Sequence, residues 1–201
     1  MSRKIKGFFI SVLMCVGGAA TANDYFVSVE VGNASTNAPT VNVPEDIAEN
    51  VITSADDSDV GWALQFGYRF NQNWSAAIGY VDLGEGKMVF EGDTDDPASF
   101  LQFASNAPIL AKGGTASVVY HLFRKDNLFV DVEFGVFKWD SDIESVTSSA
   151  RLRREESGTD LVAGVTIGVE VATQWNVVAG YKHYNLDEPI KVPYLGVKYR
   201  F

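Results

Sequence analysis

The stretch VGWALQFGYRF, residues 60–70, alternates large apolar side chains with small or polar ones. Valine, tryptophan, leucine, phenylalanine and tyrosine occupy the even positions, whereas glycine, alanine, glutamine and arginine occupy the odd ones. A period of two residues is typical of a β-strand, because successive side chains point to opposite faces. The stretch therefore predicts a strand with one continuous apolar face.

The same alternation recurs in YFVSVEVG (25–32), LFVDVEFGV (128–136) and DLVAGVTIGVEV (160–171). No helical period competes in these segments. Short, turn-rich segments follow the second, fourth and sixth predicted strands, and the other connections are mostly long. Segment 66–80 also aligns without gaps on 167–181, which indicates two copies of one hairpin. We predict eight strands, at 24–33, 60–70, 74–83, 114–123, 128–138, 159–171, 175–184 and 192–201.

The composition of the second face of these strands indicates whether the protein lies in water or in a membrane. A soluble sandwich or barrel buries its apolar face and exposes its polar face. Here the polar face is small and glycine-rich and carries both signs of charge, which suits a narrow lumen filled by paired side chains, with the apolar face toward lipid. We predict an all-β protein, an eight-stranded, antiparallel, up-and-down transmembrane β-barrel. Its predicted lumen charge network is Glu30, Arg69, Asp131, Glu133, Glu170, Lys182, Lys198 and Arg200.

The N-terminus has the pattern of a secretory signal. Three basic residues precede an apolar run that is too short to span a bilayer, and Ala20-Thr21-Ala22 supplies small residues for cleavage. We predict a cleaved signal peptide at 1–22 and an outer-membrane barrel domain at 23–201. The single cysteine, Cys15, lies within the signal, so the mature barrel has no disulfide. A net charge of −10 argues against nucleic acid as a partner.

The C-terminal stretch YLGVKYRF, residues 194–201, continues the alternation to the last residue. We expect it to pair with 24–33 and close the barrel, which removes every free strand edge. The pattern resembles the assembly signal of bacterial outer-membrane proteins, with Tyr199 and Phe201 as its aromatic residues. This resemblance implies the barrel assembly machinery as a partner.

The whole mature chain resembles the OmpA-like and OmpX-like family of eight-stranded barrels, a porin family, through GYRF (67–70), KYRF (198–201) and GYKHY (180–184). The resemblance implies a multi-pass protein of the Gram-negative cell outer membrane, with extracellular loops, periplasmic termini, and lipid and lipopolysaccharide as its surroundings. OmpA itself continues into a peptidoglycan-binding domain. Because the sequence stops at Phe201, we do not expect that activity here.

The two histidines give little indication of catalysis. His121 is expected to point inward and His183 outward, and the sequence places no serine or acid beside either to form a catalytic set. Lipid A deacylases, which share this barrel size, carry a His-x-Ser pair, but Tyr184 and Asn185 follow His183. We predict no enzyme, no catalytic residue and no cofactor. Aspartate clusters at 56–59 and 93–96 lack the glycine and glutamate of a calcium loop, so no metal site is predicted either.

The functions that we predict are assigned to the loops. Loops 34–59 and 84–113 are acidic, and the second contains an apolar stretch, 97–110, that could cap the barrel or meet a partner. The third loop differs, because Arg151, Arg153 and Arg154 could bind lipopolysaccharide phosphates. A solvated arm that nearby glutamates neutralise is the alternative for these arginines. We predict a non-enzymatic structural and surface-interaction protein whose loops contact lipopolysaccharide, other cells or host ligands. The alternatives are a small-solute pore and a lipid-modifying enzyme.

Overall fold

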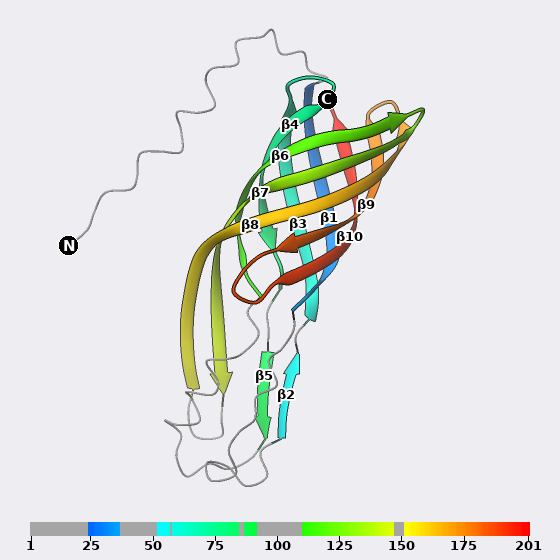
Figure 1. The fold of residues 1–201 in the computed structure, drawn as a ribbon. Helices are drawn as coiled ribbons and strands as arrows, with labels where there is room; N and C mark the ends of the chain where they lie inside the picture. The colour runs from blue at the N-terminus through cyan, green and yellow to red at the C-terminus, as the bar shows by residue number, and fades with distance from the viewer. Residues whose placement is uncertain (1–23, 37–51, 57, 85–86, 92–109, 147–150) are drawn as a thin grey trace, which may run out of the picture.

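The computed structural model describes residues 24–36, 52–56, 58–84, 87–91, 110–146 and 151–201. These residues form an antiparallel barrel with a small additional sheet beyond one end (Figure 1). The strands are β1 Tyr25–Ser35, β2 Ile52–Asp56, β3 Ser58–Arg69, β4 Trp74–Asp82, β5 Lys87–Glu91, β6 Lys112–Lys125, β7 Leu128–Val146, β8 Arg151–Ala172, β9 Trp175–Tyr184 and β10 Ile190–Arg200.

The barrel closes as the sequence predicts. Eight strands follow one another around it, and the first, β1, pairs with both β3 and β10. The register of the closing pair places Phe26 opposite Arg200, and the Phe201 amide donates to the Tyr25 carbonyl at 3.1 Å. The predicted pairing of the two chain ends is therefore confirmed, and no strand of the closed barrel is left with a free edge.

The barrel has a turn end, where three short turns join its strands, and an opposite loop end (Figure 1). In the turn between β3 and β4, the Asn71 carboxamide oxygen accepts hydrogen bonds from the amides of Asn73 and Trp74, at 2.8 and 3.0 Å. Asp126, in the turn between β6 and β7, has a φ of 52°, a left-handed conformation that aspartate tolerates in tight turns. The turns are therefore built by the polar residues that sequence analysis placed there.

Large apolar side chains cover the outside of the barrel. Phe66 is 46% exposed and Phe134 61% exposed, whereas neighbouring lumen residues such as Gln65 and Glu133 are buried. Water would make such an exterior costly, whereas lipid tails solvate it. The expected apolar-outward alternation is confirmed for β1, β3, β7, β8 and β10.

The internal repeat is visible as two equivalent aromatic pairs on the outside of the turn end. Trp74 on β4 packs against Tyr120 on β6, with ring centroids 4.7 Å apart. Trp175 on β9 packs against Tyr199 on β10 in the same way, at 4.8 Å. Both pairs are cross-strand partners in register. Together they form an aromatic belt of the kind found at membrane interfaces.

The structure differs from the expected strands at the loop end. β7 and β8 continue to Val146 and from Arg151, so they form a hairpin that extends beyond the barrel (Figure 1). β2 and β5, inside the two acidic loops, pair with each other as a separate two-stranded sheet. Neither short strand has a clear apolar alternation, which explains why sequence analysis assigned both to loops.

The predicted signal peptide at 1–22 lies outside the described residues. No helix in the described part of the chain is both long enough and apolar enough to cross a membrane.

Candidate functional site: the barrel lumen

The middle of the lumen holds a buried ion network. The Lys182 ammonium, from β9, lies 2.7 Å from the Glu30 carboxylate on β1 and 3.2 Å from the Glu133 carboxylate on β7. All three side chains are less than a tenth exposed. Charges removed from water in this way are costly unless they are paired, so the three groups depend on one another.

Neutral side chains complete this network. The Glu133 carboxylate accepts hydrogen bonds from Ser117 Oγ at 2.7 Å and from Gln65 Nε2 at 2.9 Å. Inward positions on β3, β6 and β9 therefore converge on one carboxylate of β7. The charged members of the network could be predicted from the sequence but the serine and the glutamine could not, because alternation gives the face of a residue and not its height in the barrel.

A second network lies closer to the turn end. The Asp131 carboxylate lies 2.7 Å from His121 Nδ1 and 3.2 Å from Lys198 Nζ. His121 Nε2 in turn lies 2.7 Å from Ser75 Oγ. The sequence places no serine or acid beside His121, but the structure brings both within hydrogen-bond distance of its ring. Strand pairing explains the difference, because Asp131 is the register partner of His121 and Ser75 lies on the neighbouring strand β4.

Ser75, His121 and Asp131 have the hydrogen-bond order of a nucleophile, a base and an acid. Ser75 is only 1% exposed, and the adjoining cavity has a volume of about 20 Å³. A space of this size holds about one water molecule. An ester with its acyl chain therefore does not reach the Ser75 hydroxyl in this arrangement.

Two phenylalanines enclose the Lys198 ammonium. It lies 4.9 Å from the ring centroid of Phe26 and 5.5 Å from that of Phe129. Each ring lies over a glycine on the neighbouring strand, Gly67 and Gly168, and a Cβ atom there would collide with it. The repeated glycine of the two hairpins is therefore needed to admit an aromatic ring into the lumen.

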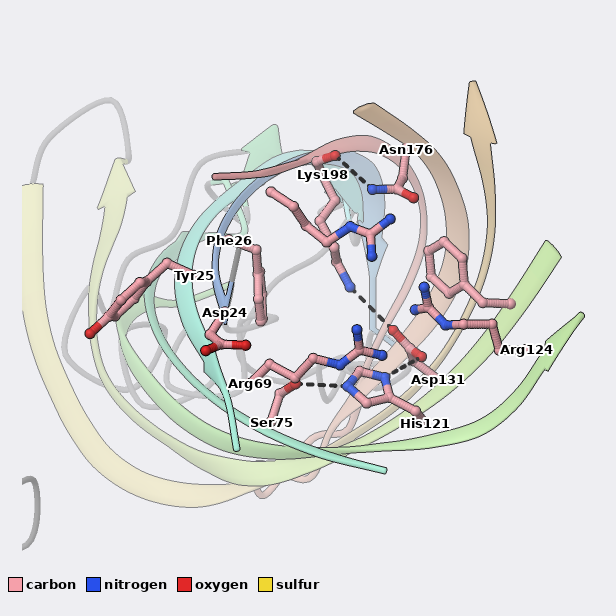
Figure 2. A pocket seen from close by; sticks show the side chains of 12 residues that line it. Asp24, Tyr25, Phe26, Arg69, Ser75, His121, Arg124, Asp131, Asn176 and Lys198 are labelled. Atoms are coloured by element: carbon pink, nitrogen blue, oxygen red, sulfur yellow. Dashed lines mark hydrogen bonds and ion pairs between the residues drawn. The ribbon is translucent and has the colours of Figure 1, made fainter. Parts of the chain in front are cut away.

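The cavity beside Ser75 is part of a pocket at the turn end of the barrel, which we call the turn-end pocket. Its lining contains both Asp131 and Lys198 (Figure 2). Arg200 pairs with Glu170 at 2.6 Å, and the Arg124 guanidinium lies 5.1 Å from the ring centroid of Phe129. Arg69 Nε is a buried atom that has no hydrogen-bond partner among the described residues. The predicted lumen charges are buried or line this pocket, apart from Glu170 at its edge, and they form separate groups rather than one network.

The loop-end half of the lumen is apolar, which sequence analysis did not predict. Phe137 and Tyr184 pack edge to face with centroids 5.0 Å apart, and both side chains are fully buried. The Trp139 indole donates to Asp160 at 2.7 Å, so its polar atom is satisfied. We call this region the loop-end core; its members include Val81, Leu83, Leu110, Phe137, Trp139, Val162, Tyr184, Leu186, Ile190 and Val192.

The predicted exterior residues lie at opposite ends of the barrel. Tyr199 and Phe201 pack edge to face at the turn end, on the outer surface. Arg151, Arg153 and Arg154 lie on β8 in the projecting hairpin, where the register partner of Arg153 is Glu144. Among the residues described, no cluster of three or more histidine, cysteine or acidic side chains could hold a metal. The aspartate cluster at 93–96 and most of the apolar stretch at 97–110 lie outside the described residues.

Comparisons with known proteins agree with this architecture. A family model described as "Outer membrane protein beta-barrel domain" matches residues 8–201. The N-terminal β-barrel domain of Pseudomonas aeruginosa OprF is similar, with a TM-score of 0.50, 14% identity, and coverage of 88% of this chain and 97% of that chain. OprG of the same organism has a TM-score of 0.54, 14% identity, and coverage of 90% and 97%. No curated protein sequence matches the chain. At these identities, the two structures show the fold.

Proposed function

Because the chain belongs to the outer membrane protein beta-barrel family, we propose that it is a non-enzymatic surface protein that acts through its extracellular loops. In this proposal the mature chain begins at Asn23, the turn end and both termini face the periplasm, and the loop end faces outward. Tyr199 and Phe201 serve as the assembly signal. The ligand of the loops is lipopolysaccharide or a related surface molecule.

The single observation that carries the proposal is the loop-end core. Phe137, Tyr184 and Ile190 are fully buried inside the barrel, so the loop-end half of the lumen is filled by apolar side chains. An eight-stranded barrel has an interior just wide enough for side chains to fill. A filled lumen argues against the pore alternative and leaves the outer surface and its projections for recognition.

The projecting hairpin of β7 and β8 is the part of this surface best suited to lipopolysaccharide. Arg151, Arg153 and Arg154 begin β8, and the backbone register of the hairpin is continuous from there to Leu161. A guanidinium binds a phosphate through two parallel hydrogen bonds, which an ammonium cannot do. We therefore place the lipopolysaccharide contact at Arg151, Arg153 and Arg154.

The test compares two triple variants in binding to phosphorylated lipid A. We expect Arg151→Ala with Arg153→Ala and Arg154→Ala to weaken binding about tenfold or more, because several charge-assisted hydrogen bonds are lost. The matched triple lysine variant keeps the charge and should weaken binding less. Lys125→Ala, at the turn end, controls for net charge alone.

Heat-dependent mobility in SDS gels checks that each variant is folded. Equal binding of the wild type and the alanine variant at every salt concentration would refute the contact, since exposed charge interactions are screened by salt. Loss of the mobility shift in the alanine variant would instead mean that these arginines stabilise the barrel.

A further inference from the structure

The turn-end pocket has an excess of positive charge in an acidic protein. Two aspartates line it, Asp24 and Asp131, whereas the whole chain has a net charge of −10. Glu170, just outside the lining, pairs with Arg200 and also attracts Arg124, so three carboxylates face the four cationic side chains. The positive excess is therefore a local property of this pocket. The cationic side chains that line it are Arg69, Arg124, Lys198 and Arg200.

Three arginines line the pocket from three strands that are not paired with one another. Arg69 ends β3, Arg124 lies near the end of β6, and Arg200 ends β10. Arg69 is repelled electrostatically by both of the others and is attracted by Asp131 and Asp24. Figure 2 shows Arg69 and Arg124 directed toward the centre of the pocket, around Asp131.

The carboxylate at the centre does not balance these groups. Asp131 is already engaged by His121 and Lys198. Arg69 Nε is buried, and no described atom accepts a hydrogen bond from it. A buried donor without an acceptor is costly, so the pocket has both a charge and a hydrogen bond that an anion would satisfy.

We propose that the mouth of the turn-end pocket is a binding site for a phosphate-type oxyanion. Arginine presents its donors in a planar fork that matches two phosphate oxygens, and Arg69, Arg124 and Arg200 all line this pocket. The pocket as a whole has a volume of about 20 Å³, room for about one water molecule. The anion therefore binds outside this volume, at the mouth.

The oxyanion has two possible sources, a free phosphate in solution and a phospholipid headgroup. Arg69 lies between Tyr68 and Phe70 in sequence, and Arg200 lies between Tyr199 and Phe201. These aromatic residues are at the interface belt, where headgroups are found. The arginines are thus at the height of the headgroups but on the inner face of the strands.

The experiment has one arm for each source and follows arginine Nε–Hε resonances of the full chain by NMR. In the first arm, protein in nonionic detergent micelles is titrated with inorganic phosphate. In the second arm, nanodiscs of phosphatidylcholine are compared with nanodiscs that also contain phosphatidylglycerol. We expect a saturable chemical-shift change of the Arg69 resonance. The Arg124→Gln variant should bind inorganic phosphate about tenfold more weakly.

Arg124 is suited to this test because it is exposed next to a turn, so its substitution is compatible with folding, which the gel mobility shift verifies. Lys125→Gln removes the same charge one residue away, outside the pocket lining, and should bind like the wild type. Movement in micelles assigns the site to a free phosphate, and movement only with phosphatidylglycerol assigns it to a headgroup. Saturable movement in neither arm, or equal effects of Arg124→Gln and Lys125→Gln, would overturn the proposal.

Discussion

The two halves of the lumen are built on the same eight strands but are filled by different chemistry. The loop-end core is apolar, with Phe137 and Tyr184 in edge-to-face contact. The turn-end half holds the Asp131 network and the arginine-lined pocket. Apolar filling needs no polar partner and blocks the lumen wherever it packs well, whereas charges are tolerated where water or a counter-ion reaches them. The comparison suggests that the barrel is sealed from the loop end and solvated from the turn end.

The ion network of Glu30, Lys182 and Glu133 is the boundary between the two halves, and its substitution has the largest expected effect. Lys182→Met leaves two buried carboxylates without their shared cation. Breaking a buried ion pair in this way costs about 3–5 kcal/mol of the free energy of unfolding. We expect a loss in this range in urea unfolding in lipid vesicles, followed by the gel mobility shift.

The control for this variant also neutralises the two carboxylates that are left without a cation. Lys182→Met combined with Glu30→Gln and Glu133→Gln should recover most of the lost stability, because neutral groups are cheaper to bury than unpaired carboxylates. A loss below about 1 kcal/mol in Lys182→Met alone would mean that water reaches the network, as expected for an exposed ion pair. The boundary would then lie nearer to the loop end.

The alternation of side chains determines how much of this arrangement could be predicted from the sequence. Period-two alternation along 60–70 and 160–171 determines which face meets lipid, so the strands, the closure and the inward position of all eight lumen charges could be predicted. Which inward residues meet depends on strand stagger, which alternation does not give. His121 and Asp131 are register partners, but Ser75 is brought to them from another hairpin.

The apolar loop-end core could not be predicted from the sequence for a related reason. Phe137 and Tyr184 have inward parity in the sequence, but the expected polar lumen gave no reason to place aromatic side chains there. The sequence also predicts a shorter β7–β8 hairpin than the structure contains. Strand pairing of β7 with β8 extends to Val146 and Arg151, where polar residues replace the apolar alternation that marks a lipid-facing strand.

The loop-end core provides the prediction with the next largest effect. Phe137→Ala removes a ring that is 0% exposed, and lipid tails cannot enter the lumen to fill the cavity. We expect a loss of about 3 kcal/mol in the free energy of unfolding. Phe134→Ala is the matched control, because Phe134 is on the same strand but 61% exposed to lipid, so its truncation loses transfer free energy without leaving a cavity and should cost less. Equal losses in both variants would show that the loop-end core is not tightly packed.

The smallest expected effects come from two buried serines, one in each network. Ser117 Oγ donates to the Glu133 carboxylate at 2.7 Å in the middle network. Ser75 Oγ lies at the same distance from His121 Nε2, beside the turn-end pocket. A hydrogen bond to a carboxylate that is closed to solvent contributes more than one that a water molecule can replace.

We therefore expect Ser117→Ala to lower the free energy of unfolding by about 2 kcal/mol and Ser75→Ala by about 1 kcal/mol. In Ser117→Ala, the Glu133 carboxylate loses a donor in a region that is closed to solvent. In Ser75→Ala, a water molecule in the adjoining cavity can replace the lost hydroxyl, because the cavity is large enough for one. The two variants are compared by urea unfolding under identical conditions. If Ser75→Ala were the more destabilising variant, the turn-end half of the lumen would be as dry as the middle, and the contrast between the two halves would be wrong.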